Sequence, residues 1–307
     1  MFDMNKYIAL LFTFAIVLLL SCDENNNPAA SNNEIDLCPE ISYLKDIPKE
    51  EITRLNLSSL QLNYICNFLY GFKNISELNI NNNSISMIGD SFSEFKSLYV
   101  FHCNHNELSE FPNVLNSLNI NYLFLGDNNI KLLNNYYMKG VQQIDLKNNQ
   151  IDLLPGPFFT ESLRWVHVQH NEIFYISDNI SNSKNLERLE ASHNKIEAIP
   201  SSLKNCTKLT HLFLDNNNLK EVPDIFHNMS ELENLNLSNN FISTIPESFS
   251  ELSNIKFLFL NNNRISSLPM NLQKWKNLEL LILHENNFSE TEKQRILEAL
   301  PNTLIFF

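Results

Sequence analysis

One pattern recurs along most of this chain and leaves few folds open to it. Each copy reads apolar, two variable, apolar, one variable, apolar, two variable, asparagine, one variable, apolar. Eleven copies begin at residues 52, 75, 98, 120, 141, 163, 186, 209, 232, 255 and 278, which gives a period of 21 to 23 residues. A unit this short cannot bury its own apolar side, so the copies must stack and share one continuous core.

The first residues of each copy predict a short strand. Apolar and variable residues alternate there, which places the apolar side chains on one side of a strand. Stacked copies then form a parallel sheet. Later in the repeat an apolar residue precedes proline, as in Ile199-Pro200, and such a proline suits the start of a short helical turn on the opposite side. The copies that begin at 120 and 141 are shorter, so we expect their second halves to be the most irregular.

The repeated asparagine has a structural role in this interpretation. Its amide can bond backbone groups where the chain leaves the strand and loses the ladder of the sheet. The first copy has Leu60 at this position, as expected of an atypical terminal repeat. We predict a structural ladder formed by Asn83, Asn106, Asn128, Asn149, Asn171, Asn194, Asn217, Asn240, Asn263 and Asn286.

The pattern over residues 52–288 resembles the leucine-rich repeat. This resemblance implies an α/β solenoid: a horseshoe with a concave parallel β-sheet and short helical or 3-10 turns on the convex side. We expect caps at both ends, because open edges invite aggregation. Residues 36–51 form the expected N-terminal cap. In the C-terminal cap, 289–307, Ser289 and Glu292 suggest a capping box that starts a helix, and an edge strand follows Pro301.

The first residues are interpreted as a targeting segment. Residues 7–20 are almost all apolar and follow Lys6, but they are too few to span a bilayer as a helix, so we predict a secretory signal peptide. The run ends in Leu19-Leu20-Ser21-Cys22, which resembles the lipobox of bacterial lipoproteins. In that family the cysteine carries lipid and becomes the first mature residue. The alternative is ordinary signal cleavage with Cys22 incidental.

The lipobox resemblance implies a signal peptide over 1–21, lipidation of Cys22 and a flexible tether over 22–35. It also implies a protein that is exported and anchored to a bacterial membrane, at the outer membrane or the cell surface. A eukaryotic secreted receptor fragment is another interpretation, which Asn-x-Ser/Thr triplets such as Asn74-Ile75-Ser76 would support. In a chain this rich in Asn and Ser, such triplets also arise by chance.

Composition excludes several function classes. The net charge is −13, and an acidic surface repels phosphate backbones, so nucleic acid is not an expected partner. Only 5 glycines occur, which argues against glycine-rich phosphate loops. The motifs H-E-x-x-H, C-x-x-C and G-x-S-x-G are missing from the sequence. We therefore expect neither a cofactor nor a resident metal, and no enzyme.

The cysteines other than Cys22 fall into two groups. Cys103 and Cys206 occupy inward positions and are expected to be buried. Cys38 and Cys66 lie in the N-terminal cap and the first repeat. Because exported proteins meet oxidising conditions, they could form a disulfide. The alternative is two free thiols.

Histidines and carboxylates gather on the strand face. Equivalent positions of neighbouring repeats lie about 4.8 Å apart in a sheet. Asp145, His167 and Glu190 should therefore share one row, with His170 beside His193. Polar residues that satisfy one another explain this pattern best. A metal-dependent hydrolase that uses these groups is the alternative function.

The outward strand positions carry unexpected apolar residues. Polar residues are the default on a solvated face, and a large aromatic patch usually marks an interaction site. The preference of aromatic residues for strands is another explanation, and homodimerisation through the concave faces is a third. We predict that a protein or peptide ligand binds to Val100, His102, Tyr122, Phe124, Trp165, His167, His211, Phe213, Phe257, Phe259, Leu280 and Ile282.

Overall fold

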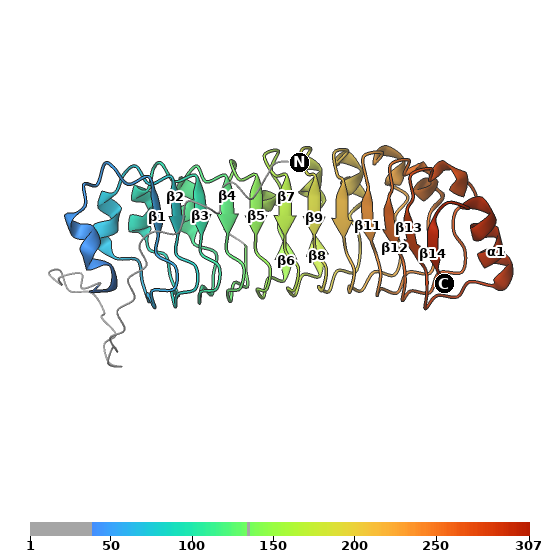
Figure 1. The fold of residues 1–307 in the computed structure, drawn as a ribbon, viewed down its shortest axis with the longest axis horizontal. Helices are drawn as coiled ribbons and strands as arrows, with labels where there is room; N and C mark the ends of the chain where they lie inside the picture. Colours follow the sequence, from blue (N-terminus) through green and yellow to red (C-terminus); the bar gives the residue numbers. More distant parts are fainter. Residues whose placement is uncertain (1–38, 134–135) are drawn as a thin grey trace. The chain divides into compact units, whose positions relative to one another are not determined.

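The computed structural model describes residues 39–133 and 136–307. The described residues all belong to one compact unit, residues 37–307. In that unit the main sheet has twelve parallel strands, each paired with the strands of neighbouring repeats (Figure 1). In spatial order they are β1 (Arg54–Asn56), β2 (Glu77–Asn79), β3 (Val100–His102), β4 (Tyr122–Phe124), β5 (Gln143–Asp145), β7 (Trp165–His167), β9 (Arg188–Glu190), β10 (His211–Phe213), β11 (Asn234–Asn236), β12 (Phe257–Phe259), β13 (Leu280–Ile282) and β14 (Leu304–Phe306).

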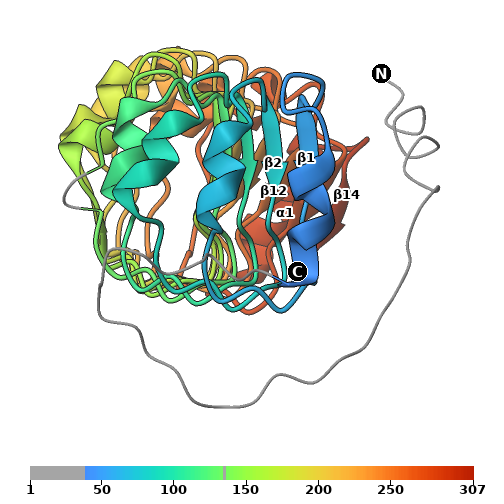
Figure 2. The same cartoon turned by 90° about the vertical axis from the view of Figure 1, so that its left-hand side faces the viewer.

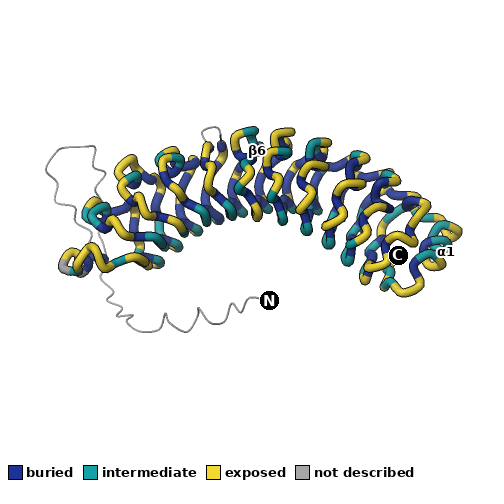
Figure 3. The backbone as a smooth tube through the Cα atoms, turned by 90° about the horizontal axis from the view of Figure 1, so that it is seen from above, coloured by how far each residue is buried: buried dark blue, intermediate teal, exposed yellow. Residues whose placement is uncertain are grey.

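Short helical turns form the layer opposite the sheet, as the view along the stack shows (Figure 2). These 3-10 helices are η3 (Pro39–Asp46), η4 (Asn67–Gly71), η5 (Asp90–Glu94), η6 (Asn113–Ser117), η7 (Gly156–Phe158), η8 (Asp178–Asn182), η9 (Ser201–Asn205), η10 (Phe226–Asn228), η11 (Glu247–Glu251) and η12 (Leu272–Lys274). Two further short strands, β6 (Leu153–Leu154) and β8 (Tyr175–Ile176), pair with each other in a second sheet. The repeats of this unit follow an arc with the main sheet on its inner side (Figure 3). The predicted fold class is confirmed.

The core lies between the strand layer and the helical layer. In each three-residue strand the middle side chain points inward, and Leu78, Phe101 and Leu212 are examples with no exposed surface. The first and last residues of the strand lie on the other side and are at least partly exposed, except Asp145 of β5, which is buried. This alternation is the expected consequence of a strand whose one side is buried. The helical turns add further inward side chains, such as Phe92 and Phe249.

The repeated asparagine bonds the backbone of its own repeat and of the one before. The Asn217 amide nitrogen lies 3.0 Å from the carbonyl oxygens of Ala191 and Leu214 and donates to both. The Asn217 side-chain oxygen accepts the Ile196 N–H at 2.9 Å. The side chain is 5% exposed, so these bonds are shielded from water. The pattern returns in the neighbouring repeats, for instance at Asn194 and Asn240.

The residue directly before each ladder position has a left-handed backbone. Its φ lies between 51° and 59° in all eleven repeats. The repeat pattern marks this position as variable, and the structure shows that it is constrained. Asn, Asp and His tolerate this region better than other non-glycine residues, which explains their frequency here. The residues are Ser59, Asn82, His105, Asp127, Asn148, His170, His193, Asn216, Asn239, Asn262 and Glu285.

Four prolines lie directly before a helical turn, close to the expected start, whereas Pro223 and Pro269 lie further upstream of η10 and η12. Pro112, Pro155, Pro200 and Pro246 are N-cap residues with extended backbone, immediately before η6, η7, η9 and η11. The carbonyl of such a proline can accept the first bond of the turn, as Pro200 accepts the Leu203 N–H at 3.0 Å. These prolines therefore occupy the residue immediately before the helical turn.

The copy that begins at 120 has the most irregular second half, as its short length predicts. Among the described residues between β4 and β5, no helical turn forms. Tyr136 fills the space instead, with its ring 5.0 Å from the rings of both Phe111 and Phe158. One aromatic side chain thus bridges the helical layers on either side.

The last element of the stack is a helix followed by a strand. Helix α1 (Glu290–Ala299) begins after Ser289, whose hydroxyl accepts the Glu292 N–H at 3.2 Å. The Glu292 carboxylate does not complete a capping box with Ser289, because it accepts the Leu268 N–H at 2.9 Å and pairs with Arg295. β14 then pairs in parallel with β13.

Candidate functional site

The concave face consists of the first and last residues of the strands in the main sheet. All twelve residues predicted to bind a ligand lie on it. Val100 and His102 come from β3, and Tyr122 and Phe124 from β4. The others come from β7, β10, β12 and β13. The register pairs each of these positions with its equivalent in the next repeat. Binding by these residues stays a prediction.

The aromatic residues of β3 and β4 contact one another. The His102 imidazole stacks on the Phe124 ring with centroids 4.6 Å apart and an interplanar angle of 4°. Burial lowers the pKa of His102, although Glu77, at 3.8 Å, opposes this effect. Tyr99, just before β3, packs edge-on against Tyr122 at 5.5 Å. This end of the concave face therefore presents a packed aromatic surface with a neutral imidazole.

Trp165 is the most accessible of the twelve predicted residues. It begins β7 and is 38% exposed, while the other eleven are half-buried. The register places it between Gln143 of β5 and Arg188 of β9. The core beneath it is supplied by Val166 and Val168, which are fully buried. The indole therefore contributes surface to the concave face rather than volume to the core.

Charged residues next to Trp165 are bonded to one another. His167 Nδ1 lies 2.8 Å from Glu190 Oε2, and Arg188 Nε donates to Glu190 Oε1 at 2.5 Å. The Arg188 guanidinium also lies over the Phe213 ring, 5.2 Å from its centroid. Burial opposes ionisation of Glu190, but the bonds and charges of His167 and Arg188 outweigh it and lower its pKa to about 2. The carboxylate is held charged and fully partnered.

His211 continues this network toward β11. Its Nδ1 lies 2.8 Å from Thr210 Oγ1, whose hydroxyl itself donates to the Glu187 carbonyl. The imidazole therefore donates through Nδ1 and accepts from the Asn234 amide through Nε2, at 3.0 Å. Burial, assisted by the charge of Arg188, lowers the pKa of His211. Both observations describe a neutral histidine.

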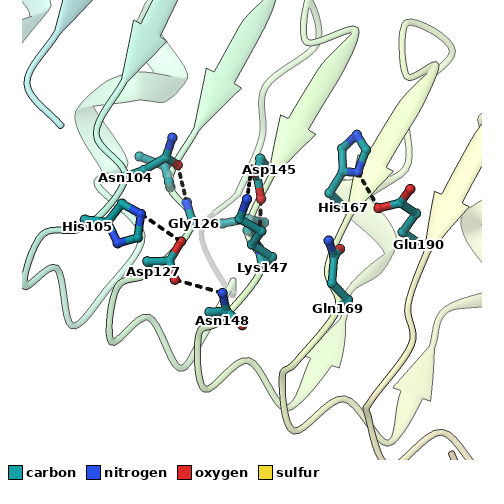
Figure 4. A network of polar contacts seen from close by, with 12 residues as sticks. Asn104, His105, Gly126, Asp127, Asp145, Lys147, Asn148, His167, Gln169 and Glu190 are labelled. Carbon is teal, nitrogen blue, oxygen red and sulfur yellow. Dashed lines mark hydrogen bonds and ion pairs between the residues drawn. The ribbon is translucent and has the colours of Figure 1, made fainter. Parts of the chain in front are cut away.

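A second row of polar contacts follows the loops after the strands (Figure 4). The Asp145 carboxylate accepts the Lys147 N–H at 3.0 Å and lies 3.5 Å from the Lys147 ammonium. His167 turns away from it toward Glu190 (Figure 4). Asp145, His167 and Glu190 thus share a row, as expected, but only two of them bond. In the same loops His170 stacks on His193 at 4.3 Å.

These groups do not form a metal site among the residues that the structure describes. No cluster of three or more His, Cys, Asp or Glu side chains has a suitable arrangement there.

An apolar group occupies the C-terminal end of the concave face. Phe257 and Phe259 of β12 pair in register with Leu280 and Ile282 of β13. The structure extends this group by two residues that the sequence pattern assigned only to an edge strand. Leu304 and Phe306 continue the two rows on β14, opposite Leu280 and Ile282. Their alternation around Ile305 was the signal that could have placed them there.

The cysteines differ in environment. Cys66 is fully buried and disulfide-bonded. Cys38, its predicted partner, and Cys22 lie outside the described residues, so the pairing and the lipidation stay predictions. Cys103 and Cys206 are free and buried, and burial raises the pKa of Cys206 to about 12. Both behave as small core residues.

No helix in the described ranges, 39–133 and 136–307, has the length and apolarity to cross a membrane.

Two family models match the C-terminal half of the repeats. A model described as "Leucine rich repeat" matches residues 222–265, and one described as "Leucine Rich repeats (2 copies)" matches residues 184–227. No curated protein matches the chain. Solved structures, in contrast, match it in large number.

Three solved structures illustrate this likeness. An internalin of Listeria monocytogenes is 22% identical with a TM-score of 0.54, over 84% of this chain and 88% of that one. The plant peptide hormone receptor RGFR1, solved with RGF2, is 23% identical with a TM-score of 0.62, over 78% and 46%. Toll of Drosophila, solved with Spätzle, is 20% identical with a TM-score of 0.63, over 77% and 38%.

Identities this low show a shared fold alone, and the matched part is less than half of each receptor chain. The described residues therefore have the fold of a leucine-rich-repeat solenoid, and the two models match leucine-rich repeats within residues 184–265.

Proposed function

We propose that this protein binds a protein or peptide partner on the concave face. The observation that carries the proposal is Trp165, an accessible indole on a strand position where folding requires no aromatic residue. Tryptophan is among the residues that concentrate binding energy when a partner covers them. Its neighbour Arg188 is fixed by Glu190, so this part of the face is ordered before a partner arrives. A preordered surface loses less entropy on binding.

The structural relatives support this kind of function without identifying the ligand. RGFR1 was solved in complex with RGF2, and Toll in complex with Spätzle. Leucine-rich-repeat domains are usually binding scaffolds rather than enzymes, although a fold alone does not determine function. Recognition without turnover is therefore the function that we propose for this chain. The packed polar network fits that role, because its members are already bonded to one another.

The binding proposal is tested by affinity capture. Wild-type protein and Trp165→Ala serve as parallel baits against an extract of the cells in which the protein and its partner occur. Tyr175→Ala is the matched control, because Tyr175 is an exposed aromatic residue on β8, outside the main sheet. We expect a partner that wild type and Tyr175→Ala retain and Trp165→Ala loses. Equal capture by all three baits contradicts a binding role for Trp165.

Export and lipid anchoring form a separate part of the proposal. They rest on the apolar run 7–20 followed by Leu19-Leu20-Ser21-Cys22. Two acyl chains on one cysteine give stable membrane attachment, whereas a single chain gives only marginal binding. Mass spectrometry of the mature N-terminus should find lipid on Cys22, and Cys22→Ser should move the protein from the membrane to the soluble fraction. An unmodified N-terminus elsewhere contradicts the anchor and leaves the binding proposal intact.

A further inference from the structure

The C-terminal end of the solenoid exposes apolar side chains beside an unpaired strand edge. β14 is the last strand of the main sheet and pairs only with β13 among the described strands. Leu304 is 58% exposed and Phe306 is 48% exposed. Phe307 and, on helix α1, Leu297 are exposed as well. Apolar surface and an open backbone edge thus occur together at this end.

The opposite end of the sheet is built differently. The outward residues of β1 are Arg54 and Asn56, and Arg54 lies 3.5 Å from Glu77 of β2. Charged and polar side chains of this kind protect an edge strand from pairing with another chain. β14 has no such residue, because its sequence is Leu304-Ile305-Phe306. One edge of the sheet carries protection against pairing and the other does not.

The backbone of β14 determines which groups are free to pair. The Leu304 N–H donates to the Glu279 carbonyl, and the Phe306 carbonyl accepts the Leu283 N–H. In a strand, successive residues direct their backbone groups to opposite sides. Those of Ile305 therefore point away from β13. A second strand can bond this residue through one N–H and one carbonyl.

We propose that two copies of this chain form a dimer by antiparallel pairing of their β14 strands about a two-fold axis at Ile305. Two residues directly opposite each other in an antiparallel pair exchange both hydrogen bonds, so Ile305 pairs with Ile305 of the second copy. Leu304 then lies opposite Phe306 of the second copy on the concave side, and both apolar pairs are buried. The contact is self-complementary, as a two-fold interface requires.

Pairing about a two-fold axis fits the residues better than head-to-tail stacking. Stacking β1 of one copy on β14 of the next would place Arg54 and Asn56 beside Leu304 and Phe306. Such a contact buries a charged group against apolar side chains, which is unfavourable. The two-fold arrangement instead joins two apolar groups, each formed by β12, β13 and β14. It does not depend on the binding proposed for the central strands.

Sedimentation of the purified protein over a range of concentrations tests the dimer. Wild type should reach twice the chain mass, and Leu304→Lys combined with Phe306→Lys should remain at the mass of one chain. The matched control is Met87→Lys combined with Phe174→Lys, which adds the same charge at exposed residues of the second and sixth repeats, away from this edge, and should still dimerise. A monomeric wild type overturns the proposal. So does a dimer that survives the two substitutions in β14, because it must form through another surface.

Cysteine pairs test the geometry independently of any change in folding. A one-to-one mixture of Leu304→Cys and Phe306→Cys chains should cross-link under mild oxidation, because these positions face each other across the axis. Leu304→Cys alone should cross-link no more than wild type, which carries the same native cysteines. Equal cross-linking of all samples overturns the arrangement. Wild type that stays monomeric yet binds an extended peptide with alternating Leu and Phe residues at this edge would identify a partner segment as the occupant instead.

Discussion

The central strands and the C-terminal strands of the concave face share one backbone and differ in chemistry. β7, β9 and β10 carry Trp165 and a network in which His167, Arg188 and Glu190 bond one another. β12, β13 and β14 carry apolar side chains at the equivalent positions. The ladder asparagines and the inward residues are alike in both regions. Outward residues can therefore differ between the two regions without a change in the backbone.

The difference also separates two ways of contacting a partner. In the central region a partner must fit polar groups whose bonds are already made, so the arrangement favours specificity. In the C-terminal region no polar side chain has to be desolvated, so association gains free energy mainly from buried apolar area. We expect the central region to select a partner and the C-terminal region to support less selective contacts, including those between copies.

The largest expected effect follows from a change in the asparagine ladder, which the two regions share. Asn217→Ala removes the amide that satisfies the Ile196 N–H and the carbonyls of Ala191 and Leu214. Buried backbone groups left without partners should lower the free energy of unfolding by about 2–3 kcal/mol. Urea melts measure the loss. Asn216→Gly is the control and should be nearly neutral, because glycine adopts the left-handed backbone of that position readily. Equal midpoints for the two variants would contradict the role of the ladder.

The second prediction compares the contributions of the two regions to partner binding. Trp165→Ala should weaken partner binding by at least about tenfold and leave the melting temperature almost unchanged, because the indole contributes to the surface and not to the core. Calorimetry with a captured partner, beside thermal melts, measures both. Phe257→Ala combined with Phe259→Ala should act in the same way only if the two regions form one continuous site. Normal binding with early unfolding of Trp165→Ala would make the residue structural.

A third prediction concerns the charge network, which only the central region has. Because the folded state lowers the pKa of Glu190 from 4.5 to about 2, its ionised form stabilises the fold above pH 4.5. This contribution is lost as the pH falls from 4.5 toward 2. Allowing for solvent screening, it should amount to about 1–2 kcal/mol near neutral pH.

Glu190→Gln should therefore be less stable than wild type near neutral pH, and the gap should close as the pH falls toward 2. Urea melts at several pH values measure it. Glu279→Gln is the matched control, because the Glu279 carboxylate forms no ion pair with a described residue. A gap that does not change with pH would mean that Glu190 acts through packing rather than charge.

The smallest expected effect tests the left-handed position itself. Asn216→Ala should cost about 1 kcal/mol, because alanine fits this backbone less well than asparagine. The neighbouring Asn218→Ala, at an ordinary loop position, should change stability by less than about 0.5 kcal/mol. Both are measured by urea melts. Equal stability of the two variants would show that alanine adopts the positive φ at position 216 with little loss of folding free energy.

The sequence predicts the parts of this structure that follow from periodicity. Strand positions, the inward side chains and the row that contains His167 and Glu190 all derive from the repeat length and the spacing of parallel strands. The left-handed residues were missed because a positive φ is only weakly visible in a single sequence. The one signal here is the frequency of Asn and His directly before the ladder position. The bond from Arg188 back to Glu190 depends on a side-chain rotamer, which spacing does not determine.

The irregular repeat after β4 has a consequence for how the solenoid comes apart. In a linear array each unit is held only by its neighbours, so stability is a sum of unit and interface contributions. Among the described residues between η6 and η7 no helical turn forms, and Tyr136 packs against both Phe111 and Phe158 there. We predict that the missing helical turn weakens the coupling at this joint, so that the protein unfolds as two cooperative blocks that meet there and a truncated Tyr136 side chain uncouples them.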